Sequence, residues 1–142
     1  MKGIHCDLEK CSGCLACVVA CIDQHYEEEQ SDAVSCRIYE KQVSERTGFM
    51  SYKTRSCHHC EDAACITVCP EQAIYRNEQG YVISVKEKCV GCQACAAACP
   101  YDIPRFDGDG KIVKCDGCYV RVVHGLKPAC VQACNTGALK MK

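Results

Sequence analysis

The run Cys89-Val-Gly-Cys92-Gln-Ala-Cys95-Ala-Ala-Ala-Cys99-Pro100 restricts the possible folds of this chain more than any other feature. Its spacing, C-x2-C-x2-C-x3-C-P, is the one in which three cysteines bind one 4Fe–4S cluster and the fourth binds a different cluster. A cubane needs four thiolates that converge from different directions, and a loop of two-residue steps supplies three of them. The fourth cysteine is expected at the start of the following helix, where it points toward a neighbouring cluster.

Four variants of this run account for most cysteines of the chain. They are Cys11, Cys14, Cys17 and Cys21; Cys57, Cys60, Cys65 and Cys69; Cys89, Cys92, Cys95 and Cys99; and Cys115, Cys118, Cys130 and Cys134. Eighteen cysteines in 142 residues indicate either a disulfide scaffold or a metal-rich protein. The N-terminal residues show no apolar leader segment, which argues against a secreted disulfide scaffold. Structural zinc sites use two separated C-x2-C pairs, which the compact spacing here does not match.

The cysteine groups form an internal repeat that predicts the organisation of the chain. Residues 9–14 match residues 87–92, and residues 64–74 match residues 129–139, so two types of motif alternate along the chain. Motifs two and three flank a predicted hairpin at residues 73–85 and form one ferredoxin-like half, so motifs one and four must close around it. The expected fold is α+β, with two ferredoxin-like halves, one nested inside the other. Short helices and β-hairpins surround four clusters.

The two halves have definite expected boundaries. The outer half comprises residues 1–30 and 109–142, the inner half comprises residues 57–108, and residues 31–56 form a hairpin insertion. The insertion is interpreted either as a solvated polar hairpin or as a docking surface for a partner, because a charged surface steers association. Its basic residues are Arg37, Lys41, Arg46, Lys53 and Arg55.

The nested arrangement predicts four sets of cluster ligands. They are Cys57, Cys60, Cys65 and Cys99; Cys89, Cys92, Cys95 and Cys69; Cys11, Cys14, Cys17 and Cys134; and Cys115, Cys118, Cys130 and Cys21. A sequential arrangement, which joins motif one to motif two and motif three to motif four, would instead place Cys134 in the set of Cys89. Cys6 and Cys36 are left over and are expected to be buried thiols that behave as small apolar residues.

The segments between the motifs predict short elements of regular structure. Alternation and turn residues predict strands at residues 3–8, 37–43, 48–53, 73–75, 81–85 and 138–141. Residues 15–28 are expected to form a helix with an acidic end at residues 27–29. His58 and His59 lie inside the second motif, where no ligand position is vacant, and are expected beside a cluster or at the surface. The other histidines, His5, His25 and His124, have no evident site.

The composition and motifs exclude several classes of function. The formal net charge of −1 gives no reason to expect nucleic-acid binding. No apolar run approaches the roughly 18–20 residues of a membrane span. The chain has no G-x-G-x-x-G motif, no P-loop and no nucleophile elbow. Fully cysteine-ligated clusters offer no iron to a substrate, so the expected task is one-electron transfer without catalysis.

The fourth motif and its surroundings resemble the four-cluster iron–sulfur subunits of the dimethyl sulfoxide reductase family. The resemblance rests on Lys114-Cys115-Asp116-Gly117-Cys118-Tyr119-x-Arg121-Val122-x2-Gly125-x-Lys127-Pro128-x-Cys130-x3-Cys134, on Arg37-Ile38-Tyr39-Glu40 and on Cys57-x-His59-Cys60-Glu61-Asp62-x-Ala64-Cys65-x2-Val68-Cys69-Pro70. Similar subunits occur in formate dehydrogenases and in other molybdenum or tungsten oxidoreductases. The resemblance covers nearly the whole chain.

The resemblance implies four 4Fe–4S clusters and a large catalytic partner subunit that holds a molybdenum or tungsten pterin. It also allows a further redox subunit, or copies of this chain, as partners in an anaerobic oxidoreductase complex. Asn135 stands where the family has proline, and the chain stops shortly after the fourth motif. This ending favours a cytoplasmic complex without a membrane anchor, although export on a signal-bearing partner stays open. The alternatives are a free-standing polyferredoxin carrier and a zinc-stabilised interaction module.

Overall fold

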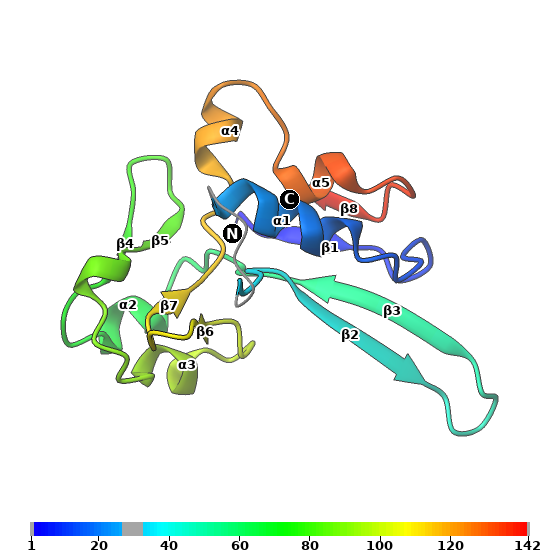
Figure 1. Ribbon diagram of the computed structural model, residues 1–142, viewed down its shortest axis with the longest axis horizontal. Coiled ribbons are helices and arrows are strands. Elements are labelled where there is room, and N and C mark those ends of the chain that lie inside the picture. Colours follow the sequence, from blue (N-terminus) through cyan, green and yellow to red (C-terminus); the bar gives the residue numbers. More distant parts are fainter. Residues whose placement is uncertain (1, 27–32, 142) are drawn as a thin grey trace.

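The structure, a computed structural model, describes residues 2–26 and 33–141 and consists of short elements around several loops (Figure 1). In chain order the elements are β1 (Ile4–Cys6), α1 (Ala16–His25), β2 (Ile38–Val43), β3 (Met50–Arg55), α2 (Ala64–Val68), β4 (Ile74–Arg76), β5 (Val82–Ser84), the 3-10 turn Lys86–Lys88, α3 (Ala94–Ala98), β6 (Arg105–Phe106), β7 (Ile112–Val113), α4 (Tyr119–Val123), α5 (Ala129–Ala133) and β8 (Leu139–Met141). Apart from the ten-residue α1, each of these α-helices has five residues. Helices this short are not stable alone, so tertiary contacts must hold them.

The strands form antiparallel pairs. Strands β2 and β3, β4 and β5, and β6 and β7 are hairpins, whereas β1 pairs with β8 from the other end of the sequence. The pairing of β1 with β8 sets Ile4 opposite Met141 and Cys6 opposite Leu139. Helices α1 and α5 also pack together, so the first and last parts of the described chain form one packed unit.

The turns of two hairpins follow from their residues. The β4–β5 hairpin turns at residues 77–80, as the sequence pattern predicted. There the Asn77 side-chain oxygen accepts a hydrogen bond from Tyr81 N at 2.8 Å. The β6–β7 hairpin was not predicted. There the Asp107 carboxylate accepts hydrogen bonds from Asp109 N and Lys111 N, both at 3.0 Å, and Gly110 has a φ of 75°. The sequence Asp-Gly-Asp-Gly at 107–110 was the available signal for this turn.

Helix α1 is shorter than predicted. It ends at His25, and Tyr26 has extended backbone angles, φ −122° and ψ 128°. The rest of the predicted helix and its acidic end, residues 27–29, lie outside the described residues.

The position of the fourth cysteine in three of the motifs differs from the predicted one. The fourth cysteine was expected at the start of a helix, but Cys69, Cys99 and Cys134 each follow the last residue of α2, α3 and α5 in an extended conformation. Prolines after Cys69 and Cys99 explain this at two sites, because a residue before proline avoids helical backbone angles.

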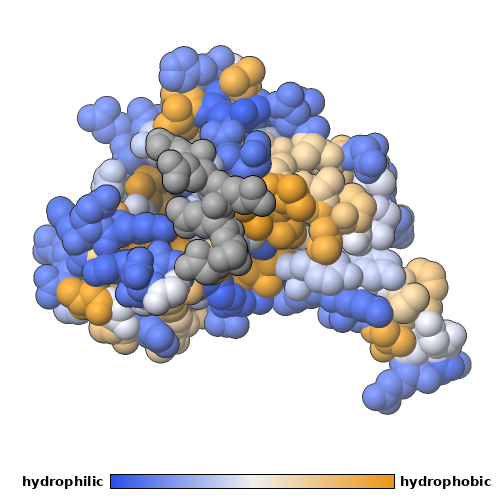
Figure 2. All heavy atoms as spheres, viewed as in Figure 1, coloured by the Kyte–Doolittle hydropathy of each residue, from blue (hydrophilic) through white to orange (hydrophobic). Residues whose placement is uncertain are grey.

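The β2–β3 hairpin is an arm that extends away from the rest of the chain (Figure 1). Its outer part exposes apolar side chains, including Phe49 with 71% of its surface accessible. Figure 2 shows further apolar residues in the middle of the same view, over α1. The base of the arm is buried: Arg37 is 3% exposed and donates to Thr54 Oγ1 at 2.9 Å and to Ser56 Oγ at 2.8 Å. The interpretation of Arg37 as a solvated hairpin residue was therefore wrong.

Among the described residues, three small cores stabilise the fold, and each contains cysteines beside aliphatic residues. One core combines Ile103 and Val113 with Cys21, Cys36, Cys57 and Cys115. The second surrounds Ile74, Val82 and Ile112, and the third surrounds Leu139. Because thiols occupy so much of each core, whatever they bind contributes to folding.

None of the helices within residues 2–26 and 33–141 has both the length and the apolar character needed to cross a membrane.

Removal of bound metal from the purified chain should unfold much of it, because the cores are built from cysteines and small aliphatic clusters. Far-ultraviolet circular dichroism of the reduced apoprotein is expected to show a large loss of helix and strand signal relative to the metal-loaded protein. A spectrum close to that of the loaded protein would contradict this expectation.

Candidate metal centres

The structure brings together the cysteines of each predicted set. Four hollows are lined, respectively, by Cys57, Cys60, Cys65 and Cys99; by Cys69, Cys89, Cys92 and Cys95; by Cys21, Cys115, Cys118 and Cys130; and by Cys11, Cys14, Cys17 and Cys134. All eighteen cysteines of the chain lie within the described residues and are free thiols, so no disulfide competes for them. Each hollow draws its thiols from two motifs that are separate in the sequence.

In the first C-x2-C pair of each motif, the third residue adopts a left-handed backbone conformation. Gly13, Gly91 and Gly117 have φ values of 73°, 75° and 70°, and His59 takes the same position in the second motif with φ 48°. Glycine is favoured here for a second reason, since a Cβ on Gly91 would lie 2.7 Å from the carbonyl oxygen of Gly110. This tight loop turns both cysteines of the pair toward one hollow.

Backbone N–H groups point at several of the sulfur atoms. His59 N lies 3.3 Å from Cys57 Sγ, and Gly117 N lies 3.2 Å from Cys115 Sγ. The equivalent contacts at the second hollow join Ile112 N to Cys89 Sγ at 3.3 Å and Ala73 N to Cys69 Sγ at 3.2 Å. Such donors stabilise a negatively charged sulfur, which is the form that binds metal.

Burial, in contrast, disfavours the negatively charged form of the cysteine thiols and raises their pKa. It raises the pKa of Cys95 and of Cys130 to about 11 and that of Cys115 to about 12. A thiol with such a pKa ionises at neutral pH only when a cation compensates its charge. Four convergent soft donors that need a cation fit a 4Fe–4S cluster, which binds through four thiolates.

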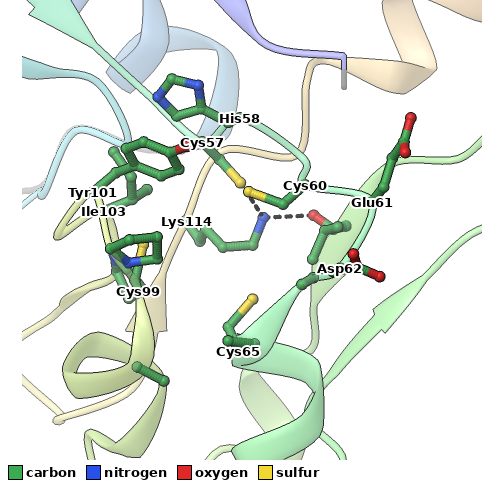
Figure 3. A pocket seen from close by; sticks show the side chains of 16 residues that line it. Cys57, His58, Cys60, Glu61, Asp62, Cys65, Cys99, Tyr101, Ile103 and Lys114 are labelled. Carbon is green, nitrogen blue, oxygen red and sulfur yellow. Dashed lines mark hydrogen bonds between the residues drawn. The ribbon is translucent and has the colours of Figure 1, made fainter.

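The hollow of Cys57, Cys60, Cys65 and Cys99 opens into a cavity of about 580 Å³ (Figure 3). Lys114 reaches into it from the segment after β7. Its ammonium group donates to Cys57 Sγ at 3.3 Å, to Val82 O at 2.5 Å and to Cys115 O at 2.8 Å. All three N–H donors of this residue are therefore used, although it is only 6% exposed. Lys114 directly precedes Cys115 in the sequence, but nothing in the sequence indicated that its ammonium group would lie beside Cys57.

The two histidines of the second motif have different surroundings. His58 stacks on Tyr101 with ring centroids 4.0 Å apart at the edge of the cavity. His59 is buried, and its Nδ1 accepts a hydrogen bond from Val82 N at 3.0 Å. Burial, reinforced by the Lys114 ammonium, lowers the pKa of His59 to about 3, so the imidazole is neutral. His59 thus lies beside the first hollow, as expected for a residue that supports ligands.

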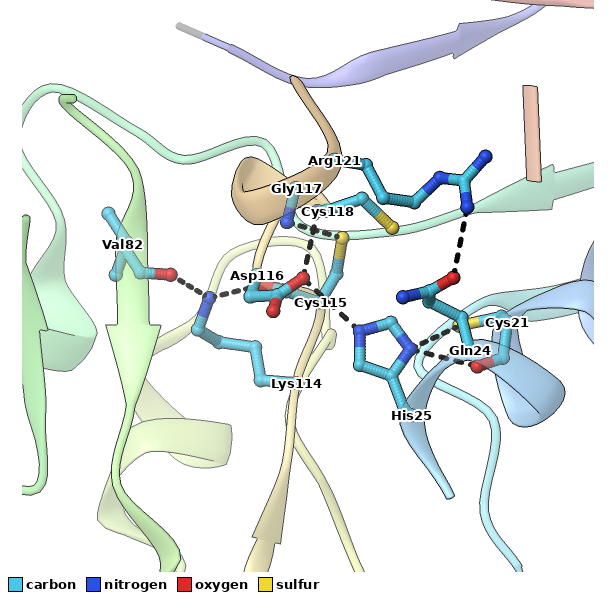
Figure 4. Close-up of polar contacts among 10 residues, drawn as sticks. All are labelled: Cys21, Gln24, His25, Val82, Lys114, Cys115, Asp116, Gly117, Cys118 and Arg121. Carbon is cyan, nitrogen blue, oxygen red and sulfur yellow. Dashed lines mark hydrogen bonds and ion pairs between the residues drawn. The ribbon is translucent and has the colours of Figure 1, made fainter. Parts of the chain in front are cut away.

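The sequence showed no evident site for His25, but the structure gives it one. It is the last residue of α1, and its side chain reaches the loop before α4 beside the hollow of Cys21 and Cys115 (Figure 4). Its Nε2 contacts Asp116 Oδ1 at 3.2 Å, and its Nδ1 donates to Cys21 O at 2.8 Å. The Asp116 carboxylate, followed by Cys21, raises the pKa of His25 to about 11. Only folding brings residues 91 positions apart into contact, so the sequence held no local signal.

The two leftover cysteines both lie near the metal-ligand candidates. Cys36 is buried as expected, and its thiol contacts the sulfur of Cys21. This contact lowers the pKa of Cys21 to about 4 and raises that of Cys36. Cys6, at the end of β1, is only partly buried and lies next to Cys11.

The packing of the cysteines gives the order of the hollows. Cys65 and Cys95 share one core, which joins the second hollow to the first. Cys57 and Cys115 share another, which joins the first hollow to the third, and Lys114 bridges the same two residues. Cys17 and Cys130 share the last core, which joins the third hollow to the fourth. The hollows therefore form a row from Cys92 at one end to Cys14 at the other, and both of these cysteines are exposed.

Comparison with known proteins agrees with this chemistry. Residues 48–142 match the 4Fe-4S dicluster domain, and residues 8–21 match the 4Fe-4S binding domain. The sequence is 42% identical to the B subunit of anaerobic dimethyl sulfoxide reductase from Haemophilus influenzae, over 96% of this chain and 71% of that protein. It is 40% identical to the protein of the same name in Escherichia coli, with the same coverage. It is also 39% identical to the thiosulfate reductase electron transfer subunit PhsB of Salmonella typhi, over 94% of this chain and 71% of that subunit.

The close approach at Gly91 generates a prediction with a matched control. Gly91→Ala and Gly48→Ala both place a Cβ at a positive φ, which costs roughly 1–2 kcal/mol. At Gly48 none of the described residues comes within 4 Å of that Cβ, whereas at Gly91 it meets the backbone oxygen of Gly110. Gly91→Ala should therefore destabilise the metal-loaded protein by about 2 kcal/mol more than Gly48→Ala. Thermal unfolding under anaerobic conditions measures the difference, and equal midpoints would contradict the close contact.

Proposed function

The chain belongs to the family of the iron–sulfur B subunits of anaerobic dimethyl sulfoxide reductase, and we propose that it is the non-catalytic electron-transfer subunit of an oxidoreductase complex. The expected resemblance to this family is confirmed, and so are 4Fe–4S clusters as cofactors. The observation that carries the proposal is the row of four hollows, each lined by four cysteines of one set. When bound, the clusters supply one-electron oxidation and reduction.

The proposed ligands are the sixteen cysteines that line the hollows, with the fourth cysteine of each motif contributed to a neighbouring set. This crossed ligation is supported by Cys134, which lines the hollow of Cys11, and by Cys21, which lines the hollow of Cys115. The zinc-stabilised module is disfavoured, because the family match concerns 4Fe–4S domains and the spacing does not form separated pairs.

We further propose two ferredoxin-like halves, with residues 57–108 nested between residues 1–30 and 109–142 and with residues 31–56 as the insertion. The pairing of β1 with β8 and the packing of α1 on α5 support the outer half. The packing of α2 on α3, next to the β4–β5 hairpin, supports the inner half. The coarser expectation, a mixed helix and strand structure with ferredoxin-like 4Fe–4S domains, is confirmed.

The exposed ends of the row are the proposed points of entry and exit for electrons. At one end Val90 stands beside the exposed Cys92, and at the other Leu15 stands beside the exposed Cys14. A large catalytic subunit with a molybdenum or tungsten pterin would cover one end, and a further redox partner would contact the other. The names of the relatives, which describe subunits of reductases, favour this arrangement over a free-standing carrier.

Lys114 is the residue proposed to set the electrostatics in the middle of the row. Its buried ammonium lies against Cys57 Sγ (Figure 3) and against the backbone of Cys115 (Figure 4), so it faces two adjacent sets. A positive charge there stabilises the reduced and more negative state of the neighbouring site. Charge and hydrogen bonds to sulfur are among the factors that set the potentials of such clusters. Lys114 should therefore raise the reduction potential at the Cys57 set.

The crossed ligation can be tested through Cys134. The wild-type protein, purified anaerobically, should contain about sixteen iron atoms, four for each cluster. Cys134→Ala should damage the cluster of Cys11, Cys14 and Cys17, whereas the set of Cys115, Cys118, Cys130 and Cys21 keeps all its ligands. Iron analysis and electron paramagnetic resonance measure the loss. A wild-type content near eight, or damage at the set of Cys89 instead, would contradict the proposal.

Replacement of Lys114 tests its electrostatic role. Lys114→Gln removes the charge and should lower the reduction potential at the Cys57 set, with a smaller decrease at the Cys115 set. Arg46→Gln, in the exposed turn that joins β2 to β3 at the outer end of the arm, removes an equal charge and should leave all potentials unchanged. Redox titration followed by electron paramagnetic resonance measures each potential. Equal potentials in Lys114→Gln and wild type, at full iron content, would show that this ammonium has no tuning role.

A further inference from the structure

The hollow of Cys21, Cys115, Cys118 and Cys130 contains one thiol more than the other three hollows. Cys36 lines it together with the four proposed ligands. Each of the remaining hollows is lined by four cysteines. Because the sequence indicated no role for Cys36 beyond filling space, the position of its thiol requires an explanation.

The thiol of Cys36 lies close enough to Cys21 to replace it. The sulfur atoms of Cys21 and Cys36 and a ring nitrogen of His25 all lie within 4.8 Å of one another. Cys36 also packs against Cys115 in the same core and is 6% exposed. A small movement of either side chain would therefore bring one or the other sulfur to the same iron.

The backbone around Cys36 is held from both sides. Ser35 Oγ donates to Val18 O at 3.4 Å in α1 and accepts a hydrogen bond from Arg37 N at 3.0 Å. The Arg37 side chain is fixed in turn by Thr54 and Ser56 at the base of the arm. These contacts with α1 and with the base of the arm hold the backbone of Cys36 beside the hollow.

We propose that Cys36 is a reserve ligand of this cluster, able to take the fourth ligand position when Cys21 is lost or released. The exchange breaks the bond from iron to the Cys21 sulfur and forms one to the Cys36 sulfur. One proton passes from the Cys36 thiol to the released sulfur, and no electron is transferred. The inference rests on the proposed function in one respect, the assignment of Cys21 as the normal ligand.

The test compares Cys21→Ala, Cys36→Ala and the double variant in the full chain, purified anaerobically. Cys99→Ala is the matched control, because Cys99 holds the same place in a C-x2-C-x2-C-x3-C run and its hollow is lined by four cysteines only. Iron content and electron paramagnetic resonance of the oxidised and reduced protein are the measurements. The signals of the other three clusters report whether each variant is folded.

Both single variants at this site should keep the iron content of the wild type, with a shifted signal for this one cluster in Cys21→Ala. The double variant and Cys99→Ala should each lose iron. The loss is either about one iron atom, which leaves a 3Fe–4S cluster with its own signal, or the whole cluster. Cys21→Ser repeats the comparison with a side chain closer in size to the thiol.

Three outcomes would overturn the reserve role. If Cys21→Ala and Cys21→Ser lose as much iron as Cys99→Ala, or yield no folded protein, Cys36 does not substitute, and Cys21 stands as an obligatory ligand. If Cys36→Ala alone loses the cluster, Cys36 is a primary ligand. If the double variant keeps all its iron, the assignment of Cys21 fails as well. Titration of the other three clusters would still test the electron-transfer function separately.

Discussion

The convergence of four thiols on each hollow is the constraint on which the other features of this structure depend. It requires a left-handed backbone conformation at Gly13, Gly91 and Gly117, and at His59 in the one motif that has no glycine at this position. In three motifs the fourth cysteine directly follows a five-residue helix (α2, α3 or α5), whereas in the first motif Cys21 lies inside the longer α1. The short elements are therefore a consequence of the spacing between ligands, and the cores are small because cysteines occupy them.

A row of buried negative groups creates an electrostatic problem that the chain addresses with few charges. Backbone N–H groups at Cys57, Cys69, Cys89 and Cys115 provide partial positive charge, and Lys114 provides a full one. His25 and Asp116 form an ion pair beside the third hollow that also ties α1 to the loop before α4. Because a buried ammonium is costly without compensation, the position of Lys114 makes sense only beside anionic sulfur.

The sequence predicted the parts of this structure that local chemistry determines. Cysteine spacing predicted the four motifs, and the order of the repeats predicted the sets of thiols that line the hollows. Turn residues such as Asn77 and Gly80 predicted the β4–β5 hairpin. It did not reveal the partners of His25 or the burial of Arg37, because those contacts join segments that are far apart along the chain. The β6–β7 hairpin was missed for a different reason: its two-residue strands are too short for alternation to be recognised, although the Asp-Gly-Asp-Gly turn was visible.

The pairing of β1 with β8 has a consequence for how the protein is made. Strand β1 is synthesised long before its partner, residues 139–141, so the pair can form only after all the segments between them have left the ribosome. The β4–β5 hairpin and the contact between α2 and α3 need no such delay, since their partners are close in sequence. Closing the larger loop costs more entropy and is slower. The inner sites can therefore form on the nascent chain before Cys11, Cys14 and Cys17 acquire their fourth thiol. During that interval these three thiols are exposed to oxidation.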